Sequence, residues 1–116
     1  MKSSFIAVQG GVVMVYEHPE GILKEAPGDL PTFAQLLKKE LRKRRRVVLL
    51  GEEAEALLEE AQLLARGGHP VGLLVQSLVP PGARVAQDDL ARKVLEDMAT
   101  LRDFYQAARA VGTAEA

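Results

Sequence analysis

The 116-residue sequence contains no cysteine, which excludes disulfide bonds, thiolate-ligated zinc sites and cysteine nucleophiles together. It has no apolar run near the roughly 20 residues that a membrane-spanning helix needs, and its start, MKSSFIAV, lacks the layout of a signal peptide. We therefore expect a cytoplasmic protein. Asparagine is also absent, while leucine, alanine, glutamate and arginine dominate, a composition that leans toward a heat-adapted source.

Hydrophobic residues make up 47% of the chain, enough for a packed core, and the length fits one domain. The net charge of -1 does not favour attraction of the whole molecule to a polyanion. The charges are unevenly distributed, however, because seven of the 15 basic residues lie within nine positions. These residues, called the basic run below, are Lys38, Lys39, Arg42, Lys43, Arg44, Arg45 and Arg46.

Residues 46–76 carry the clearest secondary-structure signals. The apolar run 47–50 predicts a strand buried on both faces, and the next fifteen residues change to a helical period near 3.6. Gly67 and Gly68 end that helix, and Pro70 prevents its continuation. Residues 71–75 then predict a second buried strand, which would complete a parallel, right-handed βαβ unit.

Residues 4–8 and 12–16 predict an antiparallel hairpin, since Gly10 and Gly11 can take the positive φ values of a tight turn. Residues 17–30 are expected to form a loop with a short extended piece at 22–23. A capping box of Thr32 and Gln35 predicts a helix over 32–44. The predicted fold is therefore α/β in the order ββαβαβα, with a small mixed sheet, two helices on one face and a long C-terminal helix.

The last predicted helix, residues 88–111, would be about 36 Å long at 1.5 Å per residue. A compact domain of this size has a radius of gyration of only about 13–14 Å, so the helix should extend beyond its own sheet. We divide the chain into an α/β part (1–80) and a linker turn plus this helix (81–116). A heptad-like apolar series then predicts a homodimer or another protein partner. The residues expected at this interface are Val94, Met98, Leu101, Tyr105 and Ala108.

The basic run has two interpretations. As a phosphate-contacting patch it would bind nucleic acid or an anionic membrane surface. As a helix C-terminus it is stabilised by the helix dipole, by roughly 0.3–1 kcal/mol per exposed site, without any ligand. No aromatic residue lies among the arginines to stack on bases. Nucleic-acid binding is therefore the alternative to the protein-interaction hypothesis.

No catalytic, cofactor-binding or metal-binding constellation can be assembled from the sequence, and no cofactor is expected. His18 and His69 each precede a proline and match no known spacing of metal ligands. Ser77 lacks a nucleophile-elbow setting, and the turn at Gly51 lacks a phosphate-binding glycine pattern. A small-molecule enzyme would need a deep pocket at the carboxyl ends of strands 47–50 and 71–76.

The glycine-turn hairpin and the segments FAQLLKKEL, RVVLLG, LLARGGHP and VGLLV together resemble the N-terminal domain of the cell-division inhibitor MinC. Over residues 4–77 the order is also similar to that of STAS domains, such as anti-sigma factor antagonists. This chain has one helix where MinC has a β-helix domain, and LLGEEAEA lacks the phosphorylatable hydroxyl of regulatory STAS domains. No functional residue is carried over. The resemblance implies a non-enzymatic domain that acts by binding another protein.

Overall fold

The computed structural model describes residues 2–80, 82–83 and 85–115, with side chains up to residue 108. A mixed four-stranded sheet forms its centre, in the order β3-β2-β1-β4. Strand β1 pairs antiparallel with β2 and parallel with β4, and β2 pairs antiparallel with β3. The strands are β1 (Ser3–Gln9), β2 (Val12–His18), β3 (Ile22–Pro27) and β4 (Arg46–Leu50).

The predicted mixed sheet, which contains an antiparallel hairpin and a parallel pair, is confirmed, but the parallel pair is β1 with β4 and not residues 47–50 with 71–75. Gly10 and Gly11 adopt φ values of +60° and +74°, and the register pairs Gln9 with Val12 across this turn. Only glycine takes this conformation without steric cost. The hairpin thus brings β2 back along β1.

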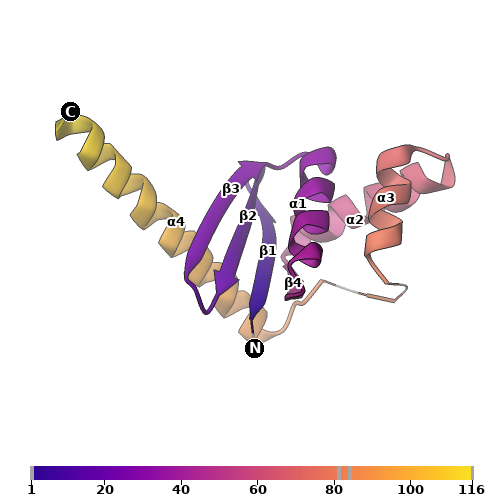
Figure 1. The fold of residues 1–116 in the computed structure, drawn as a ribbon, viewed down its shortest axis with the longest axis horizontal. Helices are drawn as coiled ribbons and strands as arrows, with labels where there is room; N and C mark the ends of the chain where they lie inside the picture. The colour runs from indigo at the N-terminus through magenta and orange to yellow at the C-terminus, as the bar shows by residue number, and fades with distance from the viewer. Residues whose placement is uncertain (1, 81, 84, 116) are drawn as a thin grey trace.

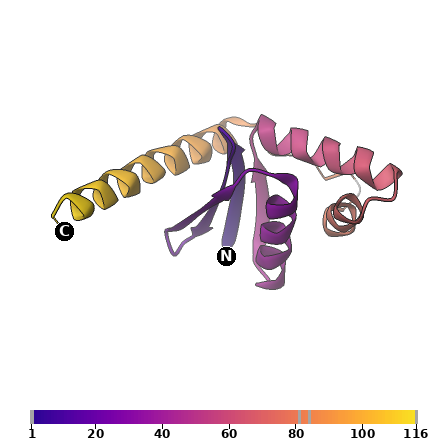
Figure 2. The ribbon, with the colours of Figure 1, turned by 90° about the horizontal axis from the view of Figure 1, so that it is seen from above.

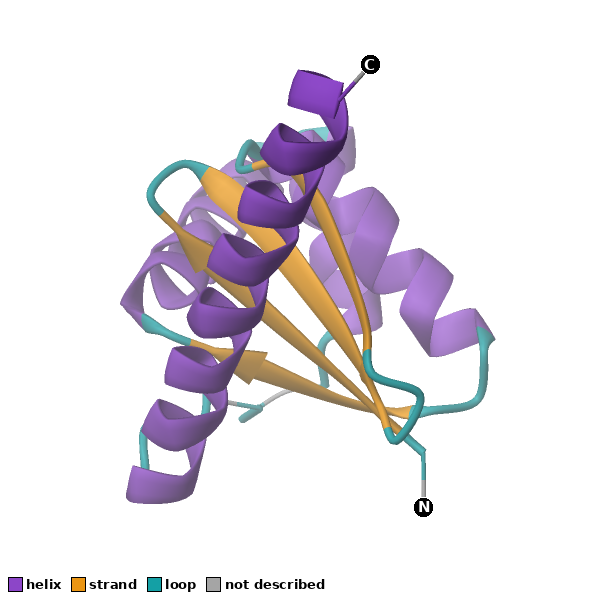
Figure 3. Cartoon of the chain, turned by 90° about the vertical axis from the view of Figure 1, so that its left-hand side faces the viewer, coloured by secondary structure: helices purple, strands orange, loops and turns teal. Residues whose placement is uncertain are grey.

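Helices cover both faces of the sheet (Figures 1 and 2). The first three lie on one face, and the fourth crosses the other face diagonally (Figure 3). The first core includes Ile6, Val15 and Phe33, whereas the second holds Met14 and Met98. The helices are α1 (Leu30–Arg42), α2 (Glu52–Arg66), α3 (Pro70–Leu78) and α4 (Asp89–Glu115).

Helix α1 begins two residues earlier than the capping box at Thr32 predicts. The N-cap is Asp29, whose Oδ1 accepts a hydrogen bond of 2.8 Å from the Thr32 backbone N–H. Pro31 lies within the first turn, where its missing N–H has no intrahelical partner to lose. The Asp29-Leu30-Pro31 start therefore replaces Thr32 with a stronger capping residue.

The predicted strand at residues 71–75 is wrong, because this segment forms helix α3. His69 is its N-cap, with Nδ1 accepting a hydrogen bond of 3.2 Å from the Val71 N–H, and Pro70 takes the first helical position. Gly72 is buried against α2, close to the backbone of Ala61 and Ala65. The fourth strand of the sheet is instead β3, in the region predicted as a loop. The order is βββαβααα rather than ββαβαβα.

Helix α4 begins as predicted and ends later than predicted. The Asp88 carboxylate accepts a hydrogen bond of 2.8 Å from the Ala91 N–H, which caps the start. The helix continues through Gly112 to Glu115. A single glycine inside a helix costs only about 1 kcal/mol relative to alanine, which is too little to end a long helix by itself. As a result the final turns of α4 extend beyond the sheet (Figure 1).

Candidate functional site

The basic run lies at the end of α1 and the start of β4, next to the amino end of β1. Two of its seven cations form ion pairs with other residues that the structure describes. Lys43 forms ion pairs with Glu17 and Glu40, and Arg45 forms one with Glu20. These two cations are therefore engaged in holding the fold together and contribute little to an outward-facing anion patch.

Arg45 connects β4 to the β1–β2 hairpin. Its Nε donates to Ser4 Oγ at 3.0 Å, and its Nη2 donates to the carbonyls of Ser3 and His18 at 2.9 and 3.0 Å. Ser3 and His18 are paired residues at the open end of that hairpin. The guanidinium satisfies both carbonyls with its fixed fork of donors, a geometry that lysine does not supply.

Lys43 lies between two buried carboxylates. Its Nζ is 2.6 Å from Glu17 Oε1 and 2.9 Å from Glu40 Oε2, and Ser4 Oγ donates to the other oxygen of Glu40 at 3.0 Å. The exposed fraction of the Glu40 side chain is only 2%. Hydrogen bonding to Lys43 is the main cause that lowers the pKa of Glu17 from 4.5 to about 2, against the opposing effect of burial. The same contact raises the pKa of Lys43.

The lowered pKa of Glu17 makes the stability of the fold depend on pH. Its contribution is complete above about pH 4.5 and is lost as the pH falls toward 2, because protonation favours the unfolded chain. Lowering the pH from 6 to 3 should remove about 2 kcal/mol through this group alone. Urea unfolding at each pH measures it. In the Glu17→Gln variant the free energy of unfolding should change less between pH 6 and pH 3. An unchanged pH dependence would show that Glu17 is not the group responsible.

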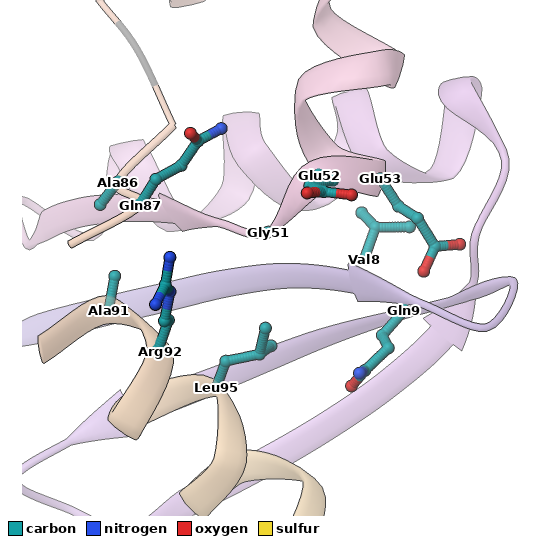
Figure 4. Close-up of a pocket in the computed structure, with 10 residues that line it drawn as sticks. All are labelled: Val8, Gln9, Gly51, Glu52, Glu53, Ala86, Gln87, Ala91, Arg92 and Leu95. Atoms are coloured by element: carbon teal, nitrogen blue, oxygen red, sulfur yellow. The ribbon is translucent and has the colours of Figure 1, made fainter. Parts of the chain in front are cut away.

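A pocket of about 350 Å³ lies at the carboxyl ends of β1 and β4 (Figure 4). Glu52 and Glu53 project from the first turn of α2, and Arg92 extends from the start of α4 toward the segment that carries Gly51. Val8 and Leu95 supply part of its apolar wall. This is the edge of a parallel strand pair where ligands commonly bind.

The enzyme alternative would require such a pocket at the carboxyl ends of strands 47–50 and 71–76, whereas the structure forms this one between β4 and β1. Some of its polar groups already have partners, since Glu53 accepts from the Gly10 N–H at 2.8 Å and Gln87 donates to Glu55 at 2.6 Å. Arg92 was missed because nothing in the sequence indicates that the starts of α2 and α4 meet. The described lining contains no serine, threonine, histidine or lysine, so it offers carboxylates and a guanidinium without an imidazole base or a hydroxyl nucleophile.

The apolar series predicted as a partner interface faces the chain's own sheet for most of its length. Met98 is 1% exposed, and Val94 packs beside it in the second core. Leu101 is half-buried. The Tyr105 hydroxyl donates a long hydrogen bond of 3.4 Å to the Gly21 carbonyl at the β2–β3 turn. Of the predicted set, Ala108 is exposed. The sheet therefore covers, fully or in part, four of the five residues that the sequence assigned to a partner: Val94, Met98, Leu101 and Tyr105.

A second series on α4, displaced by one residue, faces solvent. We call it the outer stripe. Leu90 is 70% exposed and Phe104 is 66% exposed, and the members between them are exposed as well. A pocket of about 460 Å³ runs beside its middle and is lined by Tyr16, Leu101 and three members of the stripe. The outer stripe consists of Leu90, Lys93, Asp97, Thr100, Phe104 and Ala107.

No family model, curated protein or solved structure matches this chain. Within the residues that the structure describes, no helix combines the length and apolarity needed to cross a membrane. The assignment of a function therefore depends on the chain's own surfaces.

Proposed function

We propose that this chain is a non-enzymatic protein-interaction module that self-associates through the outer stripe of α4. The observation that carries the proposal is the exposure of Leu90 and Phe104, two large apolar side chains four helical turns apart on one side of the helix. Leu90 and Phe104 are the most exposed large apolar side chains among the described residues.

The length of α4 supports the same proposal. At 1.5 Å per residue its 27 residues span about 40 Å. The molecule is 51 Å long but only 29 by 25 Å across, because the end of α4 extends beyond the sheet. An isolated helix in water is marginally stable, so a partner helix alongside would stabilise these last turns.

Covering Leu90 and Phe104 would supply a substantial driving force. Fully burying one such side chain is worth about 1.5–3 kcal/mol, and a symmetric dimer buries two of each. Part of this gain offsets the loss of translational and rotational freedom on association. The balance is consistent with a dimer that forms at micromolar concentrations.

Light scattering after size exclusion tests the proposal. The intact chain should have the mass of a dimer at tens of micromolar, and the Leu90→Asp, Phe104→Asp double variant should have the mass of a monomer. Leu63→Asp is the matched control, because Leu63 on α2 is 65% exposed and lies outside the stripe. It should leave the mass unchanged. A monomeric intact chain, or equal effects of the stripe and control variants, would overturn the proposal.

A further inference from the structure

The order of charges along the outer stripe points to the orientation of the second copy. Its members recur at spacings of three and four, the a and d positions of a heptad pattern. Lys93 and Asp97 occupy two central positions. In a parallel pair each would face its own counterpart, so that lysine meets lysine and aspartate meets aspartate. Like charges at such short range oppose association, whereas an antiparallel pair separates them.

We infer that two copies pair with their α4 helices antiparallel, in the register that places Asp97 opposite Thr100 of the partner. This inference rests on the proposed self-association. The same register places Lys93 opposite Phe104 and Leu90 opposite Ala107. The Thr100 hydroxyl then donates to the Asp97 carboxylate, and the Lys93 ammonium lies over the Phe104 ring as a cation–π contact.

The two neighbouring registers are less favourable. Shifting by one heptad toward the start of α4 would pair Lys93 with Asp97 but leave both Phe104 rings uncovered. Exposed ion pairs contribute about 0–1 kcal/mol each, less than the burial of an aromatic ring. Shifting the other way would place the Asp97 carboxylate against the Ala107 methyl group without a hydrogen-bond donor, which is costly on burial. The proposed register, with Asp97 opposite Thr100, lies between these two and avoids both penalties.

The fold leaves room for this pairing. At about 100° per residue, the outer stripe is centred roughly 120° around the helix from the residues that face the sheet. A partner helix along the stripe therefore lies on the α4 side of the sheet, away from the helices on the other face (Figure 2), and approaches the sheet at Tyr16 of β2. The pocket beside Tyr16 and Leu101 would receive part of the partner's side chains. The register also brings Glu96 near Asp103 of the partner, so association should strengthen as salt is added.

The absence of native cysteine allows a direct test by disulfide cross-linking. Leu90→Cys and Ala107→Cys chains are prepared separately, mixed, oxidised and run on a non-reducing gel. Because residue i meets residue j in such a dimer, about half of the dimers in an equal mixture should cross-link. Each variant alone should stay uncross-linked. Thr100→Cys mixed with Leu90→Cys is the register control and should not cross-link.

The outcomes separate this inference from the proposed function. If each variant cross-links with itself, the helices are parallel. If Thr100→Cys is the one that joins Leu90→Cys, the register is wrong. Either result overturns the inference but leaves self-association intact, as does a dimer by light scattering that gives no cross-link through α4. A chain that is monomeric by light scattering overturns both.

Discussion

Replacing Lys43 with methionine should destabilise the fold by about 2–3 kcal/mol, below the range for removing one partner of a fully buried ion pair, because the Lys43 side chain is 32% exposed although both of its carboxylate partners are buried. The methionine keeps most of the aliphatic stem and removes the ammonium that lies between Glu17 and Glu40. Among the described residues, the buried Glu40 would then keep the Ser4 hydroxyl as its side-chain donor, whereas Glu17 would keep the more distant Lys24 at 3.3 Å. The free energy of unfolding in urea measures the loss.

Lys39→Met is the matched control, because Lys39 lies one turn earlier on α1 and is exposed. It should change the free energy of unfolding by less than about 0.5 kcal/mol. Adding Glu17→Gln to Lys43→Met should restore part of the stability, since it removes one of the two carboxylates that Lys43 no longer neutralises. An equal effect of the two lysine variants would show that the contacts to Lys43 contribute nothing to stability.

The ion pairs of Lys43 and Arg45 explain why the role of the basic run could not be predicted from the sequence. Position along the chain predicted its place at the end of α1, which the structure confirms. The partners of its two engaged cations were not predictable, because Glu17 is 26 residues from Lys43 and Ser4 is 41 from Arg45. Such partners can be recognised as neighbours only when the strand order is known, and local periodicity in the sequence carries no information about strand order.

On α4, sequence periodicity identified an apolar face without showing what that face contacts. The series through Val94 and Met98 is the more apolar of the two on this helix, and it packs on the sheet for the ordinary reason that apolar faces are buried within the domain. The outer stripe was missed because Lys93 and Asp97 interrupt it. Leu90 and Phe104 could have indicated the outer stripe, because they are large apolar residues that lie outside the series through Val94 and Met98.

At residues 71–75 the sequence favoured the wrong element. A run such as VGLLV has the length and the β-branched ends of a buried strand, and a short apolar run has no periodicity to distinguish the two structures. The deciding features were the capping residue His69, Pro70 at the first helical position, and the close packing of Gly72 on α2. The last of these depends on tertiary structure.

Gly72→Ala should destabilise the fold by about 3 kcal/mol, at the upper end of typical overpacking effects. A Cβ at Gly72 would lie 2.5 Å from Ala65 N and 2.6 Å from Ala61 O, backbone atoms that cannot rotate away. The sign of this change in the free energy of unfolding distinguishes packing from helix propensity, because propensity alone favours alanine over glycine by about 1 kcal/mol.

Gly67→Ala provides the comparison that gives this result its meaning. Gly67 has a φ of -85°, and the nearest atom to its added Cβ, Leu64 O, is 3.6 Å away, so alanine should be neutral or stabilise by up to about 1 kcal/mol. Urea unfolding of both variants provides the measurement. A strand at 71–75 would not be held against the backbone of α2, and Gly72→Ala would then be harmless. Opposite signs at two glycines only five residues apart therefore require the packed helical hairpin of α2 and α3.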